Sequence, residues 1–315
     1  MTRLALAIAL LAALLQPAAA EDLASRTFGA VAAPSPSPAR AVGSYSRGCI
    51  AGAAPLAIDG PHWQVMRASR NRNWGHPALV ALVEDLGVSA AALGLGGVLV
   101  GDLSQPRGGP MPYGHASHQI GLDADIWFQP MPEPRFTEAE RESLPFRTVL
   151  NAAASDVDPA RFTPAYAALL ERAAKDARVE RIFVHPLIKK TMCAATEGAP
   201  SRDWLGKIRP WYGHHEHFHV RMGCPASSKA CQRQAPPPKG DGCGEALAYW
   251  FTPAPYTPDP KAKPKPPLTM AGMPRICRLL AEAGHVARPR PRPFLDQAAV
   301  PTPAGQATPV PPSPQ

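Results

Sequence analysis

Two short runs of the chain concentrate histidine and carboxylate side chains. The first extends from His115 to Asp125, and the second from His214 to His219. Imidazole nitrogens and carboxylate oxygens together are typical ligands of zinc. The two runs therefore predict a metal site, provided that the fold brings them together.

The spacing within each run indicates how its side chains are presented. His118 and Asp125 are seven residues apart, and Gly121 between them disfavours a helix. On one continuous strand an odd separation would place them on opposite faces, so the chain must turn, most easily at Gly121. His217 and His219 are two residues apart and would share one face of a strand.

A metal that is bound by His118, Asp125 and His219 would have three protein ligands. Its fourth position would hold water, which is the arrangement of a catalytic zinc rather than a structural one. His217 would then lie beside that water without binding the metal. It is therefore the candidate general base.

The second run allows an alternative. His215 to His219 also matches the His-Glu-x-x-His pattern, whose outer histidines bind zinc on a helix while the glutamate, here Glu216, acts as base. Gly213 precedes the run and Gly223 follows it, so a helix would have roughly two turns. A helical zincin protease is the less favoured interpretation.

The elements that must position these runs predict an α+β fold. We expect a small antiparallel sheet carrying the zinc site, flanked by helices and long loops and held by three disulfides. Apolar spacing predicts helices at residues 76–92, 163–176 and 273–283, the last stopped by Gly284, and strands at 97–102, 122–128 and 179–184.

The chain divides by composition into five parts. We expect a signal peptide at 1–20, a Pro/Ser/Ala-rich linker at 21–48, a domain at 49–252 that carries the predicted zinc site, a Pro/Lys-rich extension at 253–285 that returns to the domain through Cys277, and a disordered Pro-rich tail at 286–315. The apolar run Leu4–Leu15 is too short to span a bilayer and no other stretch is long enough, so we expect no integral membrane segment in the mature chain.

Export determines how the cysteines and the charge are interpreted. Six cysteines in an oxidising compartment predict three disulfides, with fifteen pairings open from the sequence alone. The net charge of +8 favours an anionic partner. No nucleic-acid motif accompanies the scattered Lys and Arg residues, so nucleic acid is not the expected partner. The sequence leaves the oligomeric state open.

The chain resembles penicillin-insensitive murein endopeptidases, which are zinc peptidases related to the lysostaphin-type and D-Ala-D-Ala-type metallopeptidases. The similarity lies in Gly114–Ile126 and the later His217–His219, which match that group's His-(x)6-Asp and His-x-His signature. It extends over most of the chain from Cys49 to Cys277. Shorter matches occur at Gly101–Ser104, Asp203–Leu205, Arg209–Trp211 and Gly240–Gly244.

The resemblance implies a role for each histidine. His118, Asp125 and His219 would bind zinc, His217 would be the general base, and His214 would stabilise the developing oxyanion. His115 would be a ligand of this metal or of a second one. The family's second site uses an Asp and a His between the motifs. Between residues 151 and 158 this chain offers Asn151, Asp156 and Asp158 but no histidine, so one zinc is expected.

The resemblance also implies substrate, compartment and disulfide pairing. The substrate would be peptidoglycan, cleaved in the periplasm at the D-alanyl–meso-diaminopimelyl crosslink. Ser-x-x-Lys is absent, which agrees with insensitivity to penicillin.

A non-enzymatic exported protein that binds metal or cell wall is the alternative function class. The implied disulfides are Cys49–Cys277, Cys193–Cys243 and Cys224–Cys231.

Overall fold

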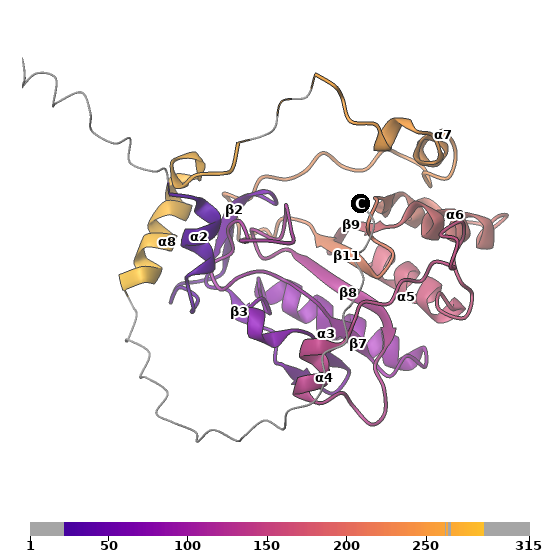
Figure 1. The fold of residues 1–315 in the computed structure, drawn as a ribbon, viewed down its shortest axis with the longest axis horizontal. Coiled ribbons are helices and arrows are strands. Elements are labelled where there is room, and N and C mark those ends of the chain that lie inside the picture. The colour runs from indigo at the N-terminus through magenta and orange to yellow at the C-terminus, as the bar shows by residue number, and fades with distance from the viewer. Residues whose placement is uncertain (1–21, 262, 264–265, 287–315) are drawn as a thin grey trace, which may run out of the picture.

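Seven strands form one mixed sheet at the centre of the computed structural model, which describes residues 22–261, 263 and 266–286 (Figure 1). Antiparallel pairing joins the central strands, whereas β10 is parallel to β9 and β5 is parallel to β7. The order across the sheet is β10 (Ile208–Pro210), β9 (Val179–Val184), β11 (His217–Met222), β8 (Asp123–Pro130), β7 (Val98–Val100), β5 (Trp63–Val65) and β4 (Asp59–Gly60).

Helices α3 (Pro77–Ala92) and α5 (Pro164–Lys175) pack on one face of this sheet. Leu82 and Leu86 of α3 and Leu169 of α5 are buried in one core with Phe218 and Val220 of β11. The other helices of the described residues are α2 (Ala24–Gly29), α4 (Glu138–Ser143), α6 (Pro186–Ala195), α7 (Glu245–Ala248) and α8 (Arg275–Val286). Short 3-10 helices are η1 (Ala68–Arg70), η2 (Asp203–Lys207), η3 (Tyr249–Phe251), η4 (Ala254–Tyr256) and η5 (Met270–Gly272). The α+β prediction is confirmed.

The predicted elements of the central part agree closely with the structure. The strand at 179–184 is β9, and the helix expected at 76–92 is α3. His76 is the cap of that helix, because its Nδ1 accepts a hydrogen bond from Ala78 N at 3.2 Å, and Pro77 fills the first helical position. These local signals account for the boundaries that could be predicted.

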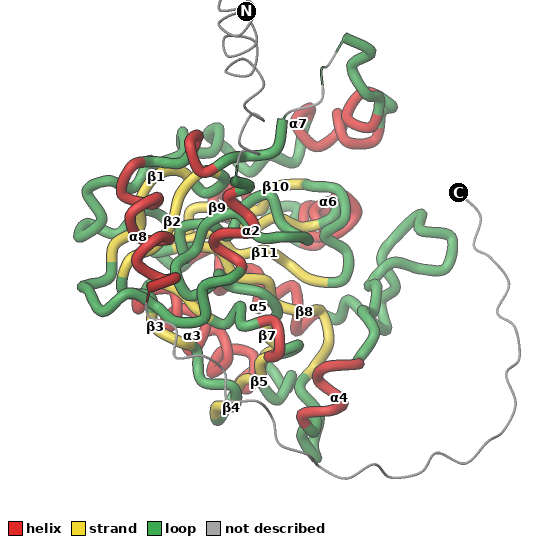
Figure 2. Tube along the Cα trace, turned by 60° about the vertical axis from the view of Figure 1, so that its left-hand side comes forward, coloured by secondary structure: helices red, strands yellow, loops and turns green. Residues whose placement is uncertain are grey.

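The N-terminal segment differs from the expected linker. Residues 21–48 contain α2, strand β1 (Arg40–Ser44) and the start of β2 (Arg47–Ala51), and α2 and β2 contact α8 at one end of the molecule (Figure 2). Ala24, Phe28 and Val42 form a small core there with Cys49 and Cys277. The Pro- and Ser-rich composition of this segment predicted an extended linker. Contacts with the distant C-terminal part of the chain give it a defined structure instead.

The C-terminal segment also differs in one detail. Helix α8 extends to Val286 and includes Gly284, so this glycine does not end the helix. A helical glycine costs about 1 kcal/mol relative to alanine, which the packing of α8 on α2 and β2 offsets. The predicted signal peptide and nearly all of the predicted tail lie outside the described residues.

All three implied disulfides are present: Cys49–Cys277, Cys193–Cys243 and Cys224–Cys231. The first joins β2 to α8, across 228 residues of sequence. Of the helices that the structure describes, none has the length and apolar character to cross a bilayer. A short sheet of β3 (Ala54–Pro55) and β6 (Trp74–Gly75) lies next to α3 and contacts the loop that leads to the first histidine run.

The first histidine run turns at Gly121, as the spacing predicted. Gly121 has φ +67°, and its carbonyl accepts a hydrogen bond from His76 N at 2.8 Å. A Cβ added here would lie 2.6 Å from Ile50 Cδ1 and 3.1 Å from His76 N. The turn therefore requires glycine for both its backbone conformation and its space.

Substitution Gly121→Ala is expected to lower the free energy of unfolding by about 2–3 kcal/mol, from left-handed strain plus overpacking. Gly198→Ala is the matched control, because Gly198 has φ +78° but nothing within 4 Å of an added Cβ. Its free energy of unfolding should fall only by the contribution of left-handed strain, about 1–2 kcal/mol. Urea denaturation of both variants measures the difference, and equal losses would contradict the packing argument.

Candidate metal centre

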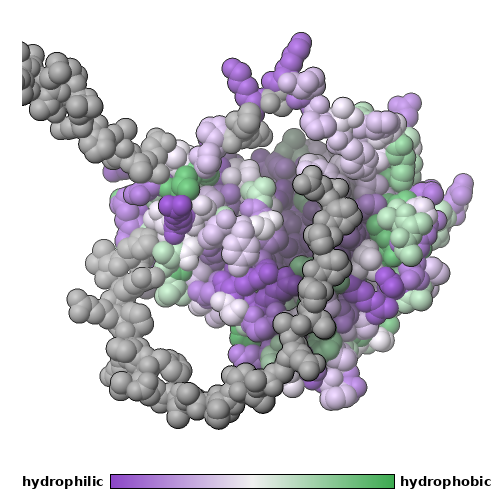
Figure 3. Space-filling model, viewed as in Figure 1, coloured by the Kyte–Doolittle hydropathy of each residue, from purple (hydrophilic) through white to green (hydrophobic). Residues whose placement is uncertain are grey.

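The pairing of β8 with β11 brings the two histidine runs together. His219 lies directly opposite Asp125, and Arg221 lies opposite Asp123. Side chains at paired positions point to the same face of a sheet, so the acidic residues of β8 meet the histidines of β11. Hydrophilic residues gather near these strands on the face shown in Figure 3.

The second run bends before it becomes a strand. His215 and Glu216 are bends, and β11 begins at His217. His215 Nδ1 lies 2.9 Å from Thr148 Oγ1, and its ring faces His185. The helical zincin interpretation is therefore wrong, because no helix places His215 and His219 on one face. The strand begins only after a break in the chain at His215 and Glu216.

His118 reaches the strands from the preceding loop. It is fully buried, has φ +65°, and its backbone N donates to Asp123 Oδ2 at 2.9 Å. Its Nδ1 lies 2.6 Å from the Leu103 carbonyl oxygen, which can only accept, so Nδ1 carries the proton. The Nε2 lone pair is then free to bind a cation.

Three ligand atoms converge in this buried site. His118 Nε2 is 3.2 Å from His219 Nδ1 and 3.4 Å from Asp125 Oδ1, and the last two atoms are 3.1 Å apart. Zinc bonds of about 2.0–2.1 Å in a tetrahedron give ligand separations of about 3.3 Å. Asp125 Oδ1 is buried and has no hydrogen-bond partner among the described residues. The donor set therefore fits a tetrahedral cation.

Asp123 contacts the side of the His219 ring that faces away from the ligand atoms. Its Oδ1 lies 3.0 Å from His219 Nε2, close enough for charge attraction although not aligned as a hydrogen bond, and 2.7 Å from Arg221 Nε, which donates to it. Burial raises the pKa of Asp123, but Arg221 and His219 outweigh burial and hold the pKa below its usual range. The resulting carboxylate holds the His219 ring with Nδ1 toward Asp125.

His115 lies on the other side of Asp125. Its Nε2 is 3.0 Å from Asp102 Oδ2 and its Nδ1 is 3.6 Å from Asp125 Oδ2. Ligand atoms of His115, His118 and Asp125 all lie within 4.8 Å of one another. Burial raises the pKa of Asp102, but His115 and Arg72 outweigh it and lower the pKa to about 2. One nitrogen of His115 is thus held by Asp102 while the other faces the site.

His217 and His214 border the ligand atoms without joining them. His217 Nε2 is 3.8 Å from Asp125 Oδ1, and the two histidine rings are 5.1 Å apart. His214 Nδ1 lies 2.9 Å from the Tyr212 carbonyl, so Nδ1 carries the proton. Burial and the neighbouring His217 lower the pKa of His214 to about 4. In the neutral ring, Nε2 is therefore an acceptor.

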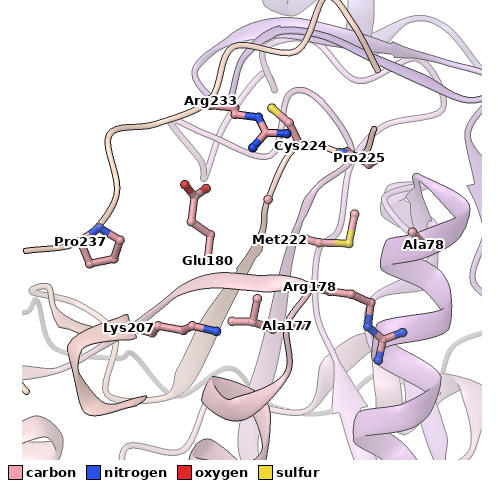
Figure 4. Close-up of a pocket in the computed structure, with 12 residues that line it drawn as sticks. Ala78, Ala177, Arg178, Glu180, Lys207, Met222, Cys224, Pro225, Arg233 and Pro237 are labelled. Carbon is pink, nitrogen blue, oxygen red and sulfur yellow. The ribbon is translucent and has the colours of Figure 1, made fainter. Parts of the chain in front are cut away.

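An open cleft of about 600 Å³ reaches the site and includes His214 and His219 in its lining. Tyr45, Phe183 and Trp211 provide apolar surface, and Trp211 remains 43% exposed. A second cavity of about 470 Å³, shown in Figure 4, lies around Met222, Arg233 and Lys207. It contains no histidine and is distinct from the metal centre.

Sequence comparison adds the family. The profile of the penicillin-insensitive murein endopeptidase family matches residues 41–282, which include every residue of the site. The chain belongs to this family. It is 44% identical over 263 residues, 83% of this chain and 94% of the relative, to penicillin-insensitive murein endopeptidases of Escherichia coli O1:K1 and of E. coli strain SMS-3-5. Family membership confirms the expectation of a peptide hydrolase.

Several site residues were not predicted as such from the sequence. Arg221 is one of them, although strand alternation places it on the face of His217 and His219. Asp102 follows a buried strand, which is a signal that could have indicated it. Arg67, Arg70 and Arg72 approach from a distant loop, and no spacing rule connects them with the histidine runs.

Proposed function

We propose that this protein is a zinc-dependent endopeptidase that cleaves the D-alanyl–meso-diaminopimelyl crosslink of murein. The observation that carries the proposal is the convergence of His118 Nε2, Asp125 Oδ1 and His219 Nδ1, with an orphaned carboxylate oxygen, in a chain of this family. A zinc ion held there would acidify a water and polarise the scissile carbonyl. Export to the periplasm belongs to the same proposal, and the three disulfides support it.

His217 is proposed as the general base. Its Nε2 lies beside the ligand atoms, while its ring is accessible enough to meet substrate. Burial lowers the pKa of His217 although Asp125 opposes this, which favours the unprotonated ring that a base requires. It accepts the proton of the attacking water at Nε2 and delivers that proton to the leaving amine.

His214 is proposed to stabilise the negative charge that develops on the carbonyl oxygen. Its Nδ1 already donates to Tyr212, so only a second proton, on Nε2, makes it a donor toward substrate. His214 would act in this role as an imidazolium that takes its second proton from solvent, and its pKa of about 4 means that this form becomes more populated as the pH falls. His115 is proposed to orient Asp125 through its second oxygen, or to bind a second ion with it.

Metal removal tests the proposal. Purified protein with zinc should release monomeric muropeptides from crosslinked sacculi, in the presence of penicillin as well. A chelator should abolish release, and added zinc should restore it, because the chain retains its ligands. Liquid chromatography of the digested sacculi measures the products. A protein that takes up zinc at this site yet never cleaves crosslinks would instead be the exported binding protein.

A further inference from the structure

The metal centre lies between two openings that share no lining residue. His219 borders the open cleft, whereas Asp125 and His217 border a small hollow of about 50 Å³. Arg67, Arg70, Trp127 and Phe146 complete the lining of this hollow, together with neighbouring residues. A peptide whose scissile bond lies at the ligand atoms therefore places one side in the cleft and the other beside these arginines.

Arg67 differs from its neighbours in forming no ion pair with the described residues. Arg70 and Arg72 pair with Asp102 at 3.2 and 2.8 Å, but no carboxylate of the described chain forms an ion pair with Arg67. Its guanidinium instead packs over aromatic rings, 4.1 Å from the Phe146 centroid and 5.4 Å from that of Trp127. Stacking fixes the direction of the guanidinium fork and leaves its donors for a ligand.

The electrostatic cost of this arrangement supports a binding role. Burial and the nearby Arg70 lower the pKa of Arg67, and the charges of Asp102, Glu216 and Glu142 offset this only in part, so the guanidinium stays charged but incompletely neutralised. Its backbone is also held in the left-handed conformation at φ +54°, a strained state that persists only where the surroundings impose it. An incoming anion would relieve the charge penalty without any rearrangement.

The substrate of the proposed function carries an anion at the required place. The scissile nitrogen belongs to an α-amino acid centre of diaminopimelate, so a carboxylate is attached to the carbon that bears this nitrogen. We propose that Arg67 binds this carboxylate on the leaving-group side of the scissile amide and thereby sets specificity for an α-carboxylated amine. The inference rests on the proposed function, because it takes its substrate from it.

Two crosslinked muropeptide dimers test the inference, one with the free α-carboxylate and one with that carboxylate converted to a carboxamide. Zinc-loaded wild-type protein should prefer the carboxylate dimer by about 10- to 100-fold in kcat/KM, the range of a charge-assisted pair. Arg67→Leu should remove this preference through KM while leaving the amidated dimer near its wild-type rate. Arg67→Lys should retain part of it, because lysine keeps the charge without the fork.

Arg147→Leu is the matched control, because Arg147 is exposed, follows Phe146 in sequence and does not line the hollow. It should keep the full preference. Unchanged zinc content and melting temperature of Arg67→Leu exclude misfolding. If the wild type cleaves and Arg67→Leu keeps its preference, or loses both substrates equally, the inference is overturned alone. If the zinc-loaded wild type cleaves neither dimer, the proposed function is overturned and the inference with it.

Discussion

Replacing His219 by alanine is expected to abolish both metal binding and hydrolysis. Its Nδ1 lies 3.1 Å from Asp125 Oδ1 and 3.2 Å from His118 Nε2, so its loss leaves two ligands and a buried cavity. Zinc affinity should fall by more than the 10- to 100-fold that loss of a supporting group costs. Hydrolysis of sacculi should fall by on the order of 10³-fold or more. Zinc titration and muropeptide release measure the two effects.

His215→Ala is the matched control for this variant. His215 lies in the same run, but it contacts Thr148 and faces His185 rather than the ligand atoms. Its loss should leave zinc affinity and hydrolysis close to wild type. Normal zinc binding in His219→Ala, or its loss in His215→Ala, would show that the second run supplies a different ligand from the one assigned here.

Replacing His217 by alanine is expected to separate binding from chemistry. His217 lies 3.8 Å from Asp125 Oδ1 and outside the three converging ligand atoms, so zinc should remain bound. Removal of a general base typically costs 10²- to 10⁴-fold in rate, and kcat should fall by about that much. Zinc content after dialysis, together with the initial rate on a purified muropeptide dimer, gives both numbers.

Glu216→Gln provides the comparison for the base. Glu216 neighbours His217 in sequence and would be the base of a helical zincin, whereas in the structure it precedes β11 and its carbonyl accepts from Phe128 N. This variant should keep most of its activity. Full activity of His217→Ala combined with an inactive Glu216→Gln would mean that the carboxylate, and not the imidazole, moves the proton.

Much of the site could be predicted because its spacing reflects local geometry. His217 and His219 share a strand face at any location in the fold, since side chains alternate along a strand. The chain had to turn at Gly121, because on one continuous strand His118 and Asp125 would lie on opposite faces. Helices α3 and α5 likewise start at Pro77 and Pro164, and the His76 side chain caps α3, so both starts were encoded within a few residues.

The parts that were mispredicted depend on contacts between distant segments. Residues 21–48 have the composition of a linker, yet Ala41 N donates to Ser228 Oγ, and Gly43 N donates to the Ala230 carbonyl. Composition measures the local tendency to remain extended and cannot include such partners. The same limit concealed Arg67, which reaches the hollow from a loop about 50 residues before the first histidine run.

The sequence by itself determined which side chains could bind a metal, which of them share a face, and where the chain must turn. Only the tertiary structure decided that Asp125 lies opposite His219, because strand register is set by pairing between distant segments. It also decided which nitrogens face the candidate metal position, since the Leu103 carbonyl fixes the His118 proton and Asp123 fixes the His219 ring. Burial then leaves Asp125 Oδ1 without a hydrogen-bond partner among the described residues, and this unsatisfied oxygen marks the polar cluster as a candidate cation site.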